Sequence, residues 1–211
     1  MRPMRKVLMG TVRAAFRVLS HCEVSGRSNV PDGGPLLVVF NHVAHLDGPL
    51  VISQMPFEVE GLALADLYRV PVTGAFLRLY GVIPVHRGEY DRALLVRALE
   101  VLSGGGTLAL APEARQSPTH ALERGQSGAA YLALRSGAPI LPVGITGTER
   151  AYSDWRSLRR TRLTLNMGPP FRLQGPLERG AARRAQLEQG RDEIMRSIAV
   201  LLPQEYRGVY G

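Results

Sequence analysis

The stretch PLLVVFNHVAHLDGPL, residues 35–50, is the part of the sequence from which the fold is most directly deduced. Its first six residues form an uncharged apolar run of strand length, which predicts a buried strand over 35–40. The segment LDGPL predicts a helix from about residue 48, because Asp is a strong N-cap and Pro is tolerated in a first helical turn. Between strand and helix lie four polar side chains, Asn41, His42, His45 and Asp47.

The same alternation of apolar runs and helical segments continues along the chain. Further strands are predicted over 60–65, 82–86, 104–112, 138–147 and 162–168. Further helices are predicted over 70–80, 89–103, 127–137 and 177–202. Strands that alternate with helices indicate an α/β domain. In a chain of 211 residues we expect a single domain whose mostly parallel or mixed central sheet has about six or seven strands flanked by helices.

The composition narrows the class of partner. A net charge of +8 and a pI near 10.3 call for an acidic partner or surface. Nucleic acid is not expected, because aromatic residues make up only 6% of the chain and no RNP, zinc-finger or basic-helix pattern is present. The lone cysteine, Cys22, provides neither a disulfide framework nor a Cys-based zinc site, so a reducing, cytoplasmic setting is expected.

The N-terminal residues 1–22 combine basic and apolar side chains at helical spacing, which predicts an amphipathic helix. Charge interrupts this segment too often for a membrane span of about 20 apolar residues, and it lacks the apolar core of a signal peptide. We expect it to lie on an anionic membrane. The alternative is an ordinary helix that covers the core with its arginines in solvent. The expected membrane contacts are Arg2, Arg5, Lys6, Arg13, Phe16 and Arg17.

His42 and Asp47 are a candidate catalytic pair at the end of the 35–40 strand, where chemistry gathers in α/β folds. If His42 lies on the loop and Asp47 caps the next helix, the two side chains can touch. The carboxylate then orients the imidazole as a general base. Two alternatives remain: a packed histidine beside a simple N-cap, and a metal site formed by His42, His45 and Asp47, with His86 as a fourth candidate ligand.

Four blocks in order resemble the glycerolipid acyltransferases, and more closely the bacterial 1-acylglycerol-3-phosphate acyltransferase family. They are N-H-x4-D at 41–47, GVIPVHRG at 81–88, APEARQS at 111–117 and APILPVGITG at 138–147. The resemblance runs from about Pro31 to Phe171. It divides the chain into a membrane-associating helix at 1–22 and an acyltransferase domain at 23–211, with the catalytic blocks within 40–147.

The resemblance implies roles for individual residues. His42 is expected to deprotonate the free hydroxyl of a lysolipid and Asp47 to orient it, so that a fatty acyl group passes from acyl-CoA or acyl-carrier protein without a covalent intermediate. The acceptor is expected to be 1-acylglycerol-3-phosphate, the product phosphatidic acid, and no metal or cofactor is expected. Arg87 is the candidate clamp for the phosphate. The other expected substrate contacts are Gly81, Glu113 and Arg115.

The third block departs from the family pattern P-E-G-T-R, because Ala114 replaces glycine and the arginine comes one residue early, at Arg115, with Gln116 in its place. Glu113 is expected either to bind a substrate hydroxyl or to orient the loop. These departures keep another lysolipid acceptor open as an alternative. A metal-dependent hydrolase and a non-catalytic lipid-binding protein are the alternatives from other functional classes. A peripheral location on the cytoplasmic face of the membrane is expected.

Overall fold

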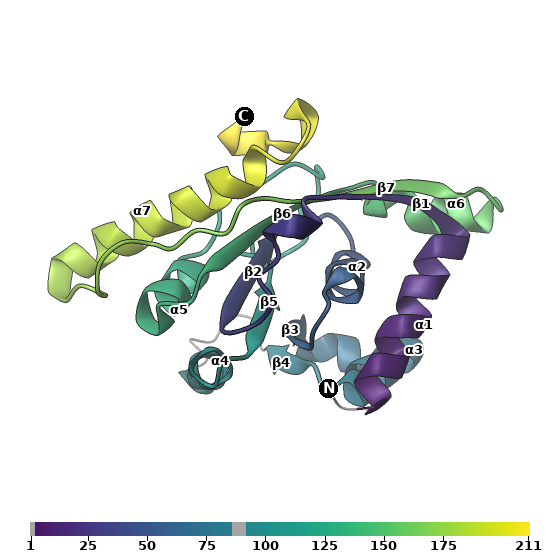
Figure 1. The fold of residues 1–211 in the computed structure, drawn as a ribbon. Coiled ribbons are helices and arrows are strands. Elements are labelled where there is room, and N and C mark those ends of the chain that lie inside the picture. Colours follow the sequence, from purple (N-terminus) through teal and green to yellow (C-terminus); the bar gives the residue numbers. More distant parts are fainter. Residues whose placement is uncertain (1–2, 86–91) are drawn as a thin grey trace.

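The protein folds into one mixed β-sheet with helices on both faces, as seen in a computed structural model that describes residues 3–85 and 92–211 (Figure 1). Within these residues the sheet has seven strands in the order β1-β7-β6-β2-β5-β3-β4, and only β6 and β7 pair antiparallel. This confirms the expected α/β fold. The strands are β1 (Ser20–Ser25), β2 (Leu36–Phe40), β3 (Val59–Leu64), β4 (Ile83–Val85), β5 (Thr107–Leu110), β6 (Ile140–Thr146) and β7 (Thr161–Met167).

The helices form two layers around the sheet. One layer consists of α4, α5 and α7, and the other of α1, α2 and α6, with α3 packed beside α1 (Figure 1). The helices are α1 (Pro3–Leu19), α2 (Asp47–Gln54), α3 (Pro71–Tyr80), α4 (Arg92–Ser103), α5 (Gly128–Ser136), α6 (Ala151–Arg156) and α7 (Gly180–Ala199).

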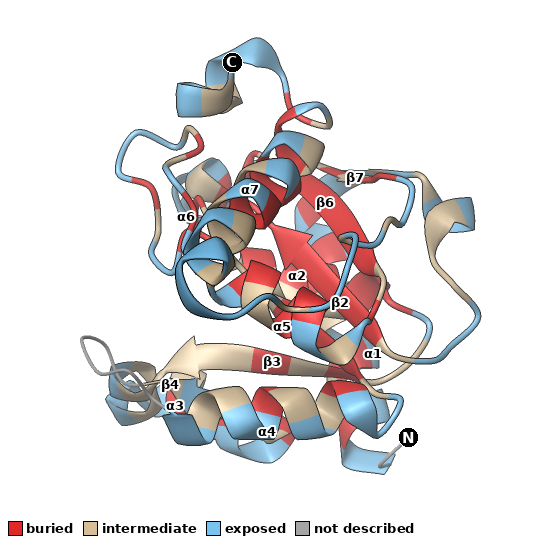
Figure 2. Ribbon diagram, turned by 90° about the vertical axis from the view of Figure 1, so that its left-hand side faces the viewer, coloured by how far each residue is buried: buried red, intermediate tan, exposed pale blue. Residues whose placement is uncertain are grey.

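The central strand β2 shows why the chain adopts three layers. Side chains of a strand alternate between the two faces of a sheet. Leu37 and Val39 accordingly pack against α4, α5 and α7, whereas Val38 belongs to the core under α1 and α2. All five residues of β2 are buried, and β2 and β6 form the buried centre in Figure 2. A strand covered on both faces reads as a continuous apolar run, which is what the sequence has at 35–40.

Two elements differ from the sequence-based expectation. The predicted N-terminal helix ends at Leu19, and residues 20–25 form the edge strand β1, paired in parallel with β7. Residues 151–156, for which no strand or helix was predicted, form the short helix α6. Both were missed because the apolar and basic pattern of 1–22 runs on into β1, and because six residues are too few to show a helical period.

The N-terminal helix turns some of the residues that were expected to contact a membrane toward the protein. Arg5 and Phe16 are buried, at 4% exposure each, so the membrane contacts expected for these two are wrong. Arg13 is partly exposed and donates to the backbone carbonyls of Ser53 and Met55 at 2.6 and 3.3 Å. A membrane contact by Arg13 stays a prediction. Lys6 and Arg17 are exposed, and Arg2 lies outside the described residues.

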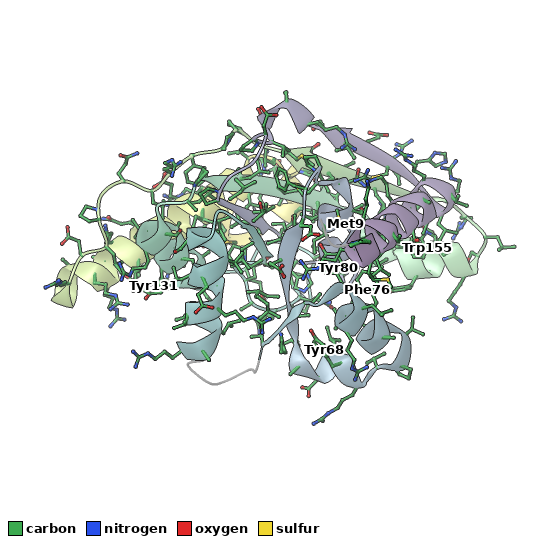
Figure 3. All side chains as sticks on the ribbon, turned by 60° about the horizontal axis from the view of Figure 1, so that its bottom comes forward. Met9, Tyr68, Phe76, Tyr80, Tyr131 and Trp155 are labelled. Carbon is green, nitrogen blue, oxygen red and sulfur yellow. The ribbon has the colours of Figure 1, made fainter. Side chains whose placement is uncertain are left out.

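Arg5 forms the main polar connection between α1 and the domain. Its guanidinium donates to both carboxylate oxygens of Glu60, at 2.5 and 2.9 Å, and to the backbone carbonyl of Tyr80 at 2.6 Å. Met9 packs one turn further along α1 against the ring of Tyr80 (Figure 3). Because this face of α1 is engaged, the opposite face is left to solvent.

Replacing the buried guanidinium tests this connection. Arg5→Met keeps much of the apolar volume but leaves Glu60 without its partner. We expect the free energy of unfolding to fall by about 2 kcal/mol, below the range for fully buried pairs because Glu60 is partly exposed. The matched control Lys6→Met changes the exposed neighbour. Equal denaturant midpoints for the two variants would contradict the role given to Arg5.

Candidate active site

His42 and Asp47 meet at the carboxyl end of β2. The Nδ1 of His42 lies 2.9 Å from Oδ2 of Asp47. The Asp47 side chain is fully buried, whereas 26% of the His42 side chain is exposed. A hydrogen bond between Nδ1 and a carboxylate leaves Nε2 without a proton, free to accept one from a substrate. The fold thus brings together the pair that the sequence suggested.

The carboxylate of Asp47 accepts hydrogen bonds from four donors. Besides His42, the backbone N–H groups of Val43 and Ala44 donate to Oδ2 at 2.7 and 2.8 Å, and Thr148 Oγ1 donates to Oδ1 at 2.5 Å. Asp47 is not the N-cap that the sequence suggested. It is the first residue of α2, and its side chain turns back to hold the loop that carries His42.

Thr148 is a residue of the site that the sequence reading missed. It is fully buried and follows β6 by two residues, in a turn that begins at Gly147. Gly147 has φ +90°, and a Cβ there would lie 2.1 Å from the carbonyl oxygen of Arg162. Only glycine therefore fits the turn that aims Thr148 at Asp47. One signal in the sequence could have pointed to Thr148: it is the first residue after the fourth block, which ends at residue 147, and so lies just past a predicted buried strand.

Asn41 joins the two strands on which the site is built. Its side-chain amide donates to the backbone carbonyl of Ile145 at 2.9 Å and accepts from the Ile145 N–H at 2.8 Å. Asn41 is 2% exposed, so both bonds are shielded from water. The pairing of β2 with β6 is thereby extended past the end of β2, next to His42.

Glu113 orients the loop on the other side of His42. Its Oε1 accepts the backbone N–H of His42 at 2.9 Å, and its Oε2 accepts that of Glu123 at 2.8 Å. Burial raises the pKa of Glu113 to about 7, against these two backbone hydrogen bonds, which lower it. Of the two expected roles, the contacts support loop orientation. Substrate binding by Glu113 stays a prediction.

The altered third block is seen directly in the backbone. Ala114 has φ +57°, in the left-handed region where glycine is unstrained. Arg115 extends outward and donates to both carboxylate oxygens of Glu123, at 2.5 and 2.8 Å. The side chain of Arg115 is 63% exposed, so this ion pair is weak and open to exchange with a substrate anion. An anion-binding role for Arg115 stays a prediction.

His45 and Gln116 form a second polar contact beside the candidate base. Gln116 Nε2 lies 2.7 Å from His45 Nδ1, so the amide donates and the ring accepts. Loss of solvent around the ring, assisted by the neighbouring His42, lowers the pKa of His45. The Ser117 N–H donates to the backbone carbonyl of His42 at 2.8 Å. The loop at 113–117 is thus bonded to the His42 segment at three points.

The remaining expected substrate residues lie elsewhere. Gly81 caps the end of α3 with φ +78°, a conformation that explains the glycine without a substrate. Its role in substrate binding stays a prediction. Arg87 lies outside the described residues, as does His86, the fourth group of the metal alternative. Within residues 3–85 and 92–211, no three His, Cys, Asp or Glu side chains gather in a way that could hold a metal ion.

An open pocket of about 570 Å³ adjoins the site. Glu113 lies in its wall together with Arg115, Glu123 and Arg124, while Gly208 and Val209 close it from the C-terminal side. His42 is not part of this wall. The pocket therefore adjoins the loop whose Glu113 accepts the backbone N–H of His42.

Comparison with known proteins assigns the chain to a family. The sequence model of the Acyltransferase family matches residues 21–146, more than half of the chain, and the protein belongs to that family. The 1-acyl-sn-glycerol-3-phosphate acyltransferase of Borreliella burgdorferi is 28% identical over 61% of this chain and 52% of its own length. A chloroplastic 1-acyl-sn-glycerol-3-phosphate acyltransferase of Brassica napus is 26% identical over 60% of this chain and 37% of its own.

The chain spans about half or less of the length of these curated relatives. Among solved structures, the 1-acyl-sn-glycerophosphate acyltransferase PlsC of Thermotoga maritima is similar in fold. Its TM-score is 0.64 at 23% identity, with 90% of this chain and 78% of that chain covered. This likeness extends to nearly the whole fold described above, beyond the segment matched by the family.

The raised pKa of Glu113 predicts how stability changes with pH. A carboxyl with a higher pKa in the folded than in the unfolded protein binds its proton more tightly when folded. Its contribution to stability is therefore present below pH 4.5 and is lost as the pH rises to about 7. We expect this fall to be smaller in Glu113→Gln, as measured by denaturant unfolding across that range. An equal fall in both proteins would contradict the assignment.

Proposed function

We propose that the protein is an acyltransferase that moves a fatty acyl group from a thioester onto the free hydroxyl of a lysolipid. The observation that carries this proposal is the His42–Asp47 pair, with a partly exposed base and a buried carboxylate. Family membership supports the reaction class. The names of the relatives support 1-acylglycerol-3-phosphate as the acceptor and phosphatidic acid as the product.

In the proposed reaction, Nε2 of His42 takes the proton from the acceptor hydroxyl as its oxygen attacks the thioester carbonyl. A C–O bond forms, and the carbonyl electrons return as the C–S bond breaks. The thiolate leaves with the proton that His42 had accepted, so the base is regenerated. Asp47 stabilises the imidazolium in between and holds the ring in one orientation. The acceptor supplies the nucleophile, so the protein itself forms no covalent bond.

The donor in this proposal is acyl-CoA or acyl-carrier protein. Either carries the acyl group as a thioester, whose cleavage supplies the driving force. The proposed reaction therefore needs no metal or cofactor. The positive charge of the chain, +8, suits both donors, since CoA carries phosphates and carrier proteins are acidic.

A second acceptor class is favoured by one specific observation. At the third block, Gln116 directs its amide to His45, while the guanidinium of Arg115 is paired with Glu123. A lysolipid whose headgroup offers hydroxyls in place of a phosphate monoester would suit a neutral donor and acceptor pair of this kind. Product analysis with a panel of lysolipids separates the two acceptors.

We place the protein at a membrane surface, on its cytoplasmic side, where the lone thiol of Cys22 stays reduced. No helix within the described residues is long and apolar enough to cross a bilayer. The outward faces of α1 and α3 expose apolar side chains instead, among them Val7 at 64% and Val72 at 83%. The two helices pack side by side, so these residues form one surface of the kind that lies in a lipid interface. We call it the α1–α3 surface; its exposed apolar residues are Met4, Val7, Val72 and Leu79.

The base assignment is tested with His42→Ala. Loss of a general base is expected to lower kcat/KM for acyl transfer from acyl-CoA to lysophosphatidic acid by about a thousandfold. The folded state is expected to persist with a modest fall in melting temperature, because three of the four donors to Asp47 remain, and binding to lipid vesicles is expected to stay unchanged.

The matched control is His21→Ala, a histidine exposed on the edge strand β1. It is expected to retain wild-type turnover. Equal turnover in His42→Ala and His21→Ala would contradict the assignment of His42 as the base. Vesicle binding by the wild type without any turnover would favour a lipid-binding protein without catalysis. Activity that chelators abolish would favour the metal-dependent alternative.

A further inference from the structure

The turn between α6 and β7 holds a leucine in a conformation and exposure that the fold does not require. The Arg159 N–H donates to the carbonyl of Asp154 at 2.9 Å, and the Leu158 N–H donates to that of Trp155 at 3.1 Å. These two bonds define a Schellman ending, in which the residue after the C-cap is left-handed and is usually glycine. Leu158 occupies that position with φ +54°.

Leu158 is also 96% exposed. A leucine here has both the strain of a left-handed side-chain-bearing residue and the cost of apolar surface in water. Glycine would satisfy the same two hydrogen bonds without either cost. Packing within the chain therefore does not account for the leucine, and a contact with an apolar partner outside the chain does.

Arginines surround this leucine. Arg156 and Arg159 flank it in the sequence and are exposed. Arg160 donates to the backbone carbonyls of Arg17 and Ser20, at 2.6 Å each, and so ties the turn to the end of α1. Arg159 also lies 3.8 Å from Asp154, in an exposed ion pair that is weak. An apolar tip beside two exposed arginines complements a surface with negative charge over an apolar interior, which is the arrangement of an anionic bilayer.

The turn is continuous with the α1–α3 surface. At the end of α1, Val18 is 70% exposed, next to the carbonyls that Arg160 binds. Trp155 of α6 packs against Phe16 of α1, with ring centroids 6.3 Å apart. Figure 1 shows α1, α3 and the α6–β7 turn on the same side of the molecule, and Figure 3 shows Trp155 on that side as well.

We propose that the α6–β7 turn is a second point of membrane contact, in which Leu158 inserts below the headgroups of an anionic bilayer and Arg156 and Arg159 bind the lipid phosphates. The inference rests on the membrane location proposed above and adds a separate site to it. Two points of contact fix the orientation of a protein on a surface, whereas a single point leaves it free to tilt. The turn is joined through α6 to Thr148, which donates to the carboxylate of Asp47.

Vesicle binding of the full chain tests the inference, with vesicles of phosphatidylcholine alone and vesicles that also contain phosphatidylglycerol. Leu158→Gly removes the apolar tip and relieves the left-handed strain, so the protein is expected to melt at the same or a higher temperature. Its partition onto anionic vesicles is expected to fall about tenfold. Val200→Ala is the matched control, because Val200 is 71% exposed at the end of α7, on the other face of the sheet. It is expected to bind like wild type.

The charge of the turn is tested with Arg156→Gln and Arg159→Gln. Each is expected to weaken binding to anionic vesicles about fivefold at low salt, with little effect on phosphatidylcholine vesicles. If wild type and Leu158→Gly bind anionic vesicles equally well, the inference about the turn is overturned, whereas the proposed membrane location of the protein stands. An unchanged partition together with a raised KM for acyl-CoA would also overturn it, by assigning the turn to the donor. A wild-type protein that binds no vesicles would overturn both.

Discussion

The buried carboxylate of Asp47 is the constraint on which the rest of the site depends. Removing an ion of this size from water costs several kcal/mol, and only well-placed donors offset such a cost. Four donors surround Asp47, and they come from the loop after β2 and from the turn after β6. The position of His42 is therefore fixed by two strands that are about a hundred residues apart in sequence and adjacent in the sheet.

Neighbouring contacts make this arrangement rigid. Asn41 binds the backbone of β6, and Glu113 holds the amide of His42 from the opposite side. A proposed base that is held on both sides loses little conformational freedom when a substrate arrives, which favours proton transfer. Glu113 is 4% exposed, and this burial raises the pKa of its carboxyl.

The sequence predicted the elements that have a strong local signal. The strand β2 and the helices over 70–80 and 127–137 were confirmed, because each rests on an apolar run, a helical period or a glycine that ends the helix. The expected contact between His42 and Asp47 was found as well, whereas their catalytic role stays a proposal. Thr148 and the inward-facing Arg5 were not foreseen, since both act through residues distant in sequence. An amphipathic pattern places charged residues on the solvent face, so it could not predict that Arg5 points inward. Arg5 does so because it pairs with Glu60.

In the proposed chemistry, Asp47 fixes the tautomer of His42 so that Nε2 is the base. The most direct measurement is the ¹⁵N chemical shift of both ring nitrogens of His42 in protein labelled with ¹⁵N-histidine, above the pH at which the ring is protonated. We expect a protonated Nδ1 and an unprotonated Nε2 in the wild type, and loss of this preference in Asp47→Asn. A neutral His42 with its proton on Nε2 would contradict the proposed chemistry, because that nitrogen could not then accept the substrate proton.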